Sequence, residues 1–359
     1  MAITVYVTST ERFSGKTAFC VGLLRWLKQA GHTVGYMKPI STSALGTGDQ
    51  VIDEDARFIK AVLGLSEPLE IMSPILFTDK DEEVLLRTTD PSDFEERVRA
   101  AHAVVADGKD VVIMEGGSSL REGWIINLAP PRLAELLDAH VLVVVPYAVG
   151  LHAVDDLLAA RSWLAGRLLG GAINSVPRHR MDFVKGAIEP FLNRHALPVF
   201  AVVPKEKSLF SVTVSELAHE LNGEILCCTK SIDELVENMV VGAMGVESAL
   251  SHFRRVTKKA VVTGGDRPDI QMAALETSTS CLILTGGMPP NPLIIGRAED
   301  RKVPIILTRH DTFQTVGIAS SFLGKTRFHQ EKKVPYFEKL LAGHMNFDAF
   351  LTALGIKTH

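Results

Sequence analysis

The 359-residue sequence predicts an α/β fold, with a doubly wound, mostly parallel sheet followed by a second, smaller α/β domain. Short runs of Val, Ile and Leu alternate with amphipathic helical patterns along the chain. These runs are apolar at successive positions, as in strands that are buried on both faces of a parallel sheet. In addition, the first run leads into the segment Thr8 to Thr17, which ends in Ser14-Gly15-Lys16-Thr17 and opens the first helix, where such a sheet places a phosphate-binding turn.

The sequence predicts six strands and six helices in the first domain. The expected strands are 3–8, 33–38, 110–115, 140–145, 169–174 and 198–203, and the expected helices lie near 16–30, 53–63, 91–106, 129–138, 151–165 and 181–195. Three similar units follow at 260–266, 282–287 and 305–311, each a strand that ends in a polar turn. The expected organisation is therefore a first domain at 1–205, a connector at 206–222, a second domain at 223–325 and a helical tail at 326–359.

Composition and charge exclude several classes of protein. The chain is 46% apolar and 22% charged, which excludes intrinsic disorder. Its 38 Lys and Arg against 42 Asp and Glu argue against a nucleic-acid or membrane-surface partner. The longest apolar run, 141–145, is far shorter than the ~18 residues of a membrane span. The first residues lack the pattern of a signal peptide, and four cysteines without metal-ligand spacing indicate a reducing compartment, so we expect a cytoplasmic protein.

The segment Ser14-Gly15-Lys16-Thr17 is the closing half of a phosphate-binding loop. Gly15 lets the backbone approach a phosphate, and the helix that follows offers unpaired N–H groups. Lys16 can reach the terminal phosphates of a nucleotide, and the Thr17 hydroxyl can bind Mg²⁺. The opening glycine of the motif is missing: depending on the loop length, Thr10 or Ser9 stands in its place.

Further polar residues follow the expected strands, at the sheet edge where this fold binds ligands. Lys38 ends the second strand and is either a second phosphate-binding cation or a surface lysine. Glu115 ends the third strand, before two glycines, and suits a Mg²⁺ or water ligand. The acids at 53–55 open a helix, where they serve as metal ligands or as caps, and spacing does not choose among them. Asn174 ends the fifth strand and either pairs with an adenine or caps the turn.

With these residues in place, 1–205 resembles dethiobiotin synthetase and its relatives among the cobyrinic acid amidating enzymes. The matching positions are Thr8 to Thr17, Lys38-Pro39, Asp55-Ala56, Glu115-Gly116 and Asn174. The resemblance implies that Ser14, Gly15, Lys16, Thr17, Lys38 and Asn174 bind ATP and that Thr17, Asp55 and Glu115 bind Mg²⁺. It is the resemblance that selects Asp55 from its acidic neighbours. Ser9 and Ser118-Ser119 depart from the family pattern, and the second departure affects the expected substrate region.

The second domain resembles a DRTGG domain. The residues that carry this resemblance, and form its expected ligand site, are Asp266, Arg267, Thr285, Gly286, Gly287 and Asp311. Glycines beside an arginine can hold an anion, whereas the alternative is an Asp–Arg structural pair with glycines that the turns require. The order of the two domains is similar to that in the amino-terminal part of long bacterial phosphate acetyltransferases.

Three functions remain open from the sequence. The first is an ATP- and Mg²⁺-binding regulator, linked to acetyl-phosphate or central carbon metabolism, that responds to nucleotide or a small metabolite and acts on a protein partner. The second is an ATPase or an ATP-dependent ligase or carboxylase that forms an acyl or carbamoyl phosphate, with Lys16 and Lys38 as catalytic residues. The third is a scaffold with a degenerate nucleotide site. Acetyl transfer is not expected from the roughly 35 residues after the second domain, and the resemblances favour a homodimer.

Overall fold

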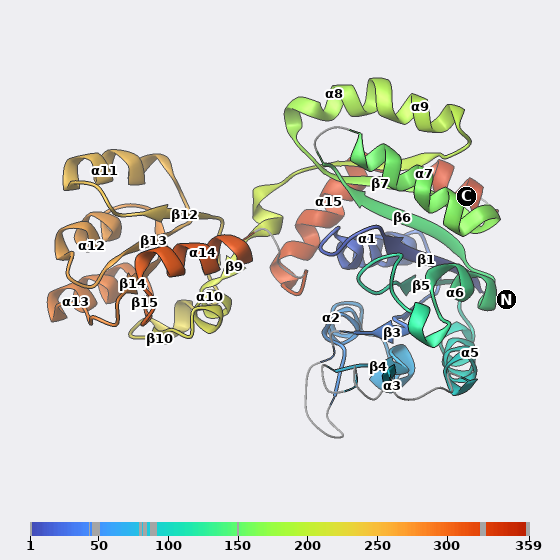
Figure 1. The fold of residues 1–359 in the computed structure, drawn as a ribbon, viewed down its shortest axis with the longest axis horizontal. Helices are drawn as coiled ribbons and strands as arrows, with labels where there is room; N and C mark the ends of the chain where they lie inside the picture. The colour runs from blue at the N-terminus through green and yellow to red at the C-terminus, as the bar shows by residue number, and fades with distance from the viewer. Residues whose placement is uncertain are drawn as a thin grey trace. The chain divides into compact units, whose positions relative to one another are not determined.

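The computed structural model describes residues 2–42, 44, 51–78, 81, 85–86, 92–148, 151–323 and 328–356. The chain forms two compact units: Met1–Lys205 together with Arg327–His359, and Glu206–Thr326. Each unit is a sheet covered by helices (Figure 1). The predicted fold class is thereby confirmed: a mostly parallel sheet with helices, and a second, smaller α/β region.

The described strands of the first unit's main sheet have the order β2-β5-β1-β6-β7-β8, and all their pairings are parallel. Their bounds are Ile3–Ser9 for β1, Val34–Met37 for β2, Val111–Glu115 for β5, His140–Pro146 for β6, Leu168–Val176 for β7 and Val199–Pro204 for β8. Strand β1 lies between β5 and β6, where the path of the chain across the sheet reverses. Ligands bind at this point in open α/β sheets.

Helices pack on the sheet much as the sequence predicts. Their bounds are Lys16–Gln29 for α1, Glu54–Leu63 for α2, Leu69–Met72 for α3, Ser92–Ala106 for α5, Pro130–Leu136 for α6, His152–Leu164 for α7, Met181–Phe183 for α8 and Glu189–Arg194 for α9. Helices α5, α6 and α7 share one apolar cluster with Tyr6, Val143 and Ile173 of the sheet. A short parallel pair, β3 (Ile40–Ser41) and β4 (Ile75–Leu76), lies outside the main sheet.

The tail, expected from the sequence as a helical segment at 326–359, belongs to the first unit. It forms α15 (Val334–His344) and α16 (Phe347–Ala353). In α15, the Phe337 ring packs edge-on against Phe19 of α1, with ring centroids 5.4 Å apart. In the segment that follows, Met345 pairs with Ala201 on the open edge of β8. The second unit is therefore an insertion in the chain of the first.

In the second unit the described strands have the order β10-β15-β14-β13-β12, and only β10 pairs antiparallel within this sheet. The strand bounds are Val212–Thr213 for β9, Glu224–Ile225 for β10, Leu235–Val236 for β11, Asn238–Val241 for β12, Lys259–Gly264 for β13, Thr279–Thr285 for β14 and Ile305–Leu307 for β15. The helix bounds are Val214–Glu220 for α10, Val246–Arg255 for α11, Pro268–Leu275 for α12, Pro292–Arg301 for α13 and Thr312–Phe322 for α14.

The three repeated units of the sequence are the adjacent parallel strands β13, β14 and β15. The stretch 206–222, expected as a connector, contributes Val214 and Leu217 of α10 to the core of this unit. Within the described residues, no helix has the length and apolar character needed to cross a membrane.

Candidate functional site

The loop between β1 and α1 has the geometry of an anion-binding turn. Gly15, the residue before α1, has φ +94°, a left-handed conformation that glycine adopts without strain. Helix α1 then begins at Lys16, and its first N–H groups have no partner within the helix. The Ser14 hydroxyl is buried and has no hydrogen-bond partner among the residues that the structure describes. A bound anion would supply acceptors for these donors.

Lys16 is held inside the loop. Its ammonium donates to the Ser9 hydroxyl at 2.9 Å and to the Ser118 carbonyl at 3.1 Å. Ser9 in turn donates to the Glu11 carbonyl at 2.7 Å. Ser9, which stands where the family has a glycine, therefore holds the lysine of the loop. Burial lowers the pKa of Lys16, although the nearby Glu115 carboxylate opposes that shift.

Thr17, Asp55 and Glu115 meet at the carboxyl ends of β1 and β5. The Thr17 hydroxyl lies 2.6 Å from Glu115 Oε1 and 3.3 Å from Asp55 Oδ1. Tyr36, a residue that the sequence did not single out, donates its hydroxyl to Glu115 Oε2 at 2.9 Å. Burial, followed by the Asp55 charge, raises the pKa of Glu115 to about 7.

Lys38 lies between two of the three acids that open α2. Its ammonium is 2.8 Å from Asp53 Oδ2 and also pairs with Asp55 Oδ2. Asp53 caps α2 by accepting a hydrogen bond from the Ala56 N–H at 2.8 Å. Burial alone would raise the pKa of Asp55, but the Lys38 charge and the hydrogen bond from His329 together outweigh burial and hold that pKa well below its usual range. The structure thus separates the acids: Asp53 caps the helix, and Asp55 faces Thr17.

These side chains fit a nucleotide phosphate with Mg²⁺. Hydroxyl and carboxylate oxygens are the ligands that Mg²⁺ prefers, and protein sites usually supply only one or two carboxylates, the rest coming from phosphates and water. Within the described ranges, no group of three His, Cys, Asp or Glu is arranged to hold a metal ion. The Lys38 ammonium pairs with Asp55, and the charges of Glu115 and Asp55 act on the Lys16 ammonium. The buried Ser14 hydroxyl, three residues before Thr17, has no hydrogen-bond partner among the described residues.

Asn174 lies against the phosphate loop. Its side-chain N–H₂ donates to the Ser14 carbonyl at 2.8 Å, and its side-chain oxygen accepts from the Ser175 N–H at 2.8 Å. A Cβ at Gly15 would overlap the Asn174 amide nitrogen. In this arrangement Asn174 fixes the backbone of the loop, and its expected role at an adenine remains a prediction.

His329 of the tail reaches the same site, which the sequence did not predict. Its Nε2 lies 2.6 Å from Asp55 Oδ1. The two residues are 274 positions apart, and nothing in the local pattern around His329 indicates a site. Only the tertiary fold brings His329 to Asp55.

In the loop after β5, Ser118 and Ser119 depart from the family pattern, and the backbone of Ser118 is hydrogen-bonded within the chain. The Ser118 N–H donates to the Glu122 carboxylate, and the Thr42 hydroxyl donates to the same carboxylate. The Ser118 carbonyl accepts from Lys16. Both backbone groups of Ser118 are therefore taken by partners within the chain.

In the second unit, the expected DRTGG residues make structural contacts. Arg267 forms a two-point ion pair with Asp269, with both N–O distances 3.1 Å. Asp311 caps α14 by accepting from the Gln314 N–H at 2.7 Å. The hydroxyl groups of Thr285 and Thr312 are 2.9 Å apart.

The glycines of this motif lie in the turn after β14, and Asp266 lies in the turn after β13. Gly286 and Gly287 have φ +79° and +67°, so the turn itself requires them. Asp266 is exposed in the turn after β13. A ligand site at these six residues remains a prediction.

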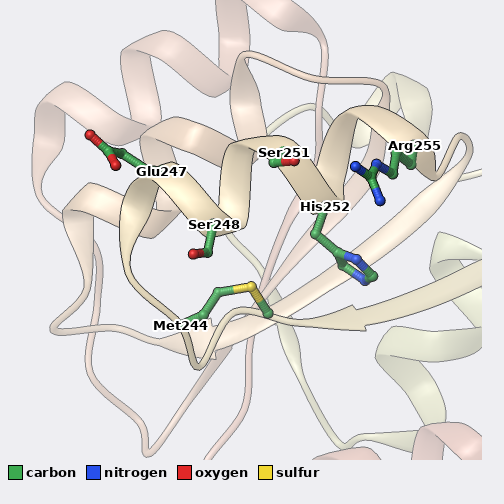
Figure 2. Close-up of a pocket in the computed structure, with 6 residues that line it drawn as sticks. All are labelled: Met244, Glu247, Ser248, Ser251, His252 and Arg255. Atoms are coloured by element: carbon green, nitrogen blue, oxygen red, sulfur yellow. The ribbon is translucent and has the colours of Figure 1, made fainter.

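A pocket of about 510 Å³ lies elsewhere on the second unit, along α11 (Figure 2). Its lining residues are Met244, Glu247, Ser248, Ser251, His252 and Arg255. Figure 2 shows that all but Met244 project from the one helix, and none of the expected DRTGG residues lines the pocket.

Comparisons with known proteins agree with this architecture. A family model described as an AAA domain matches residues 3–213, and one described as a DRTGG domain matches residues 216–322. Phosphate acetyltransferase of Haemophilus influenzae is 24% identical over 97% of this chain and 52% of its own length. The enzyme of Nitrosomonas europaea is 26% identical over 81% of this chain and 43% of its own length. ATP-dependent dethiobiotin synthetase of Caldicellulosiruptor saccharolyticus is 32% identical over 20% of this chain and 30% of its own length.

The chain spans about half the length of the phosphate acetyltransferases that it matches. The AAA-domain match covers more than half of the chain and coincides with the sheet that carries the phosphate loop. The chain therefore belongs to this AAA-domain family of P-loop proteins, is similar to dethiobiotin synthetase in that part, and continues into a DRTGG domain as the amino-terminal part of phosphate acetyltransferases does.

Proposed function

We propose that the first unit binds ATP with Mg²⁺ and that the DRTGG domain makes the chain a nucleotide- or metabolite-responsive regulator connected with acetyl-phosphate metabolism. The observation that carries the proposal is the contact of Thr17 with Glu115 and Asp55 beside the ammonium of Lys16. A lysine ammonium and the oxygen ligands that Mg²⁺ prefers lie together here, near the N-terminus of α1, whose first N–H groups have no partner within the helix. The similarity to phosphate acetyltransferases supports the metabolic connection.

Each residue has a role in this proposal. The N–H groups of the loop and the ammonium groups of Lys16 and Lys38 would hold the phosphates. Thr17, Asp55 and Glu115 would hold the metal, which when bound neutralises charge on the phosphates. Lys38 is paired with Asp53 and Asp55 in this structure, so it would exchange a carboxylate for a phosphate on binding.

Calorimetry with ATP and with ADP, each with and without Mg²⁺, tests nucleotide binding. We expect the wild-type chain to bind both, and Lys16→Ala to lose about 1.5–3 kcal/mol of binding free energy, the contribution of a hydrogen bond to a charged group, or roughly 10- to 150-fold in affinity. Lys28→Ala, an exposed lysine on the same helix, serves as the matched control. A wild-type chain that binds neither nucleotide at millimolar concentration would refute the proposal.

The regulatory half of the proposal needs a second titration. Small acids and nucleotides are titrated onto the whole chain in the presence and absence of saturating ATP with Mg²⁺. A ligand of the DRTGG domain that acts as a regulator must change the ATP affinity, and ATP must change the affinity for that ligand by the same factor. Ligands whose affinities are independent of ATP would contradict regulation.

An ATP-dependent ligase is the second candidate, and the similarity to dethiobiotin synthetase favours it. The contact of Ser118 with Glu122 argues against it, because an internal carboxylate takes the backbone N–H in the expected substrate region. A ligase would release ADP many-fold faster when its acid or amine substrate is added. Screening small acids and amines for this stimulation distinguishes the two functions.

A further inference from the structure

The segment 328–330 brings the chain back from the second unit to the candidate nucleotide site. Phe328 is buried and packs edge-on against Phe58 of α2 and Phe337 of α15, with ring centroids 6.2 and 5.7 Å apart. The His329 ring lies 5.6 Å from the Phe58 ring. Aromatic contacts of this kind fix an apolar side chain in one place. The backbone that carries His329 is therefore anchored on α2, the helix that also carries Asp55.

His329 makes a short, direct hydrogen bond to Asp55. Its Nε2 lies 2.6 Å from Asp55 Oδ1, and its Nδ1 lies 3.9 Å from Glu54 Oε2. A carboxylate can only accept a hydrogen bond, so Nε2 carries the proton and donates it. The imidazole side chain is 19% exposed and the Asp55 side chain 13%, so water competes weakly with this bond.

The two oxygens of Asp55 have different partners. Oδ1 accepts from His329 at 2.6 Å and faces the Thr17 hydroxyl at 3.3 Å, whereas Oδ2 pairs with the Lys38 ammonium. When Lys38 moves to a phosphate, as the proposed function requires, Oδ2 becomes free. His329 then remains as the partner that fixes the direction of the carboxylate.

We propose that His329 is a positioning residue that orients the Asp55 carboxylate for Mg²⁺ in the nucleotide complex. The inference rests on the proposed function, because it assigns Asp55 to the metal. Partners that hydrogen-bond a metal-binding carboxylate commonly change metal affinity by 10- to 100-fold when they are removed. His329 would thereby link the tail, which follows the DRTGG domain in the chain, to the Mg²⁺-dependent part of nucleotide binding.

The test separates the Mg²⁺-dependent part of ATP affinity from the Mg²⁺-independent part. ATP is titrated into the wild-type chain, His329→Ala, His329→Gln and the control His252→Ala, once with excess Mg²⁺ and once with EDTA. His252 lies on α11 in the second unit, outside the phosphate site. We expect His329→Ala to weaken ATP binding about tenfold or more with Mg²⁺ and less than about twofold with EDTA. His329→Gln keeps an N–H donor and should lie within about threefold of wild type.

Thermal unfolding of the same four proteins separates positioning from tail anchoring. If His329 only anchors the tail, His329→Ala lowers the melting temperature and weakens ATP binding equally in both buffers, which would overturn the inference. Affinity within twofold of wild type in Mg²⁺ would also overturn it. Failure of the wild-type chain to bind ATP in either buffer would instead refute the proposed function, and this role of His329 with it.

Discussion

Replacing Lys38 by methionine tests the electrostatic core of the site. Lys38 is 4% exposed, and its ammonium lies 2.8 Å from the Asp53 carboxylate and in contact with Asp55. Methionine keeps an apolar stem of similar length and removes the charge. Asp53, which is buried, and Asp55, whose side chain is 13% exposed, then lose this counter-charge, and breaking a buried ion pair in this way costs about 3–5 kcal/mol. We expect Lys38→Met to lower the free energy of unfolding of the first unit by about this amount.

The pH dependence gives the same prediction a second readout. Although burial opposes the shift, the two aspartates raise the pKa of Lys38, and Lys38 lowers that of Asp55. The lowered Asp55 pKa contributes stability above the unfolded pKa of about 3.9, and that contribution is lost as the pH falls through the folded value. The raised Lys38 pKa contributes stability below about 10.4, lost as the pH rises through the folded value. The difference between wild type and variant should therefore be largest near neutral pH and shrink in acid.

Tryptophan fluorescence during urea unfolding measures the effect on the first unit alone. The three tryptophans of the chain, Trp26, Trp124 and Trp163, all lie in that unit. Lys339→Met, at an exposed position of α15 in the same unit, is the control and should change the unfolding free energy by no more than about 0.5 kcal/mol. A loss below about 1 kcal/mol in Lys38→Met would show that the two aspartates do not depend on Lys38, and would refute the reasoning.

Three further predictions concern the loop, the metal ligands and the second unit. Gly15→Ala should lower the melting temperature and abolish ATP binding, because its Cβ overlaps Asn174 in a left-handed backbone that costs about 1–2 kcal/mol for alanine. Burial raises the pKa of Glu115 to about 7, so Mg²⁺ affinity in calorimetry should rise from pH 6 to 8, with proton release. Burial lowers the pKa of Lys259 to about 8. Between about pH 8 and 10.4 the unfolded chain therefore binds more protons at this residue than the folded chain does, and the free energy of unfolding of the second unit should rise with pH across this range. Lys259→Met should remove this rise, as followed by circular dichroism in denaturant.

Each of these predictions has a control or an opposite outcome. Gly186→Ala places a Cβ in open space and should leave ATP binding unchanged. A Mg²⁺ affinity that is flat between about pH 6 and 8 would show that Glu115 is not a ligand. If the free energy of unfolding of the second unit rose equally with pH in wild type and in Lys259→Met, the rise could not be due to Lys259.

Most of the fold could be predicted because the strands are continuous apolar runs. Each expected strand of the first sheet lies within two residues of β1, β2, β5, β6, β7 or β8. Strands that are apolar at every position are buried on both faces, as they are in a parallel sheet that helices cover on both sides. The short strands β9 to β12 escaped the prediction, because two to four residues carry too little periodicity.

From the residues alone, the candidate site could be predicted where its residues follow strands, and Asp55, which opens a helix, was selected by the family resemblance. Lys16, Thr17 and Glu115 were identified from their place at strand ends, and the structure brings Thr17 and Glu115 together. Tyr36 was missed because it looks like any aromatic residue inside a strand, and its role depends on a pairing of β2 with β5. His329 was missed because its contact depends on the chain returning from the second unit.

A crystal structure of the whole chain with ATP and Mn²⁺ would show directly whether the first unit binds nucleotide and metal at the phosphate loop. Mn²⁺ prefers the same oxygen ligands as Mg²⁺, and its anomalous scattering locates it without ambiguity. We expect an anomalous peak about 2.0–2.2 Å from the Thr17 hydroxyl and beside the carboxylates of Asp55 and Glu115, with the phosphates on the Ser14–Thr17 loop. A peak and nucleotide located only on the second unit, with Lys38 still paired to Asp53 and Asp55, would contradict it.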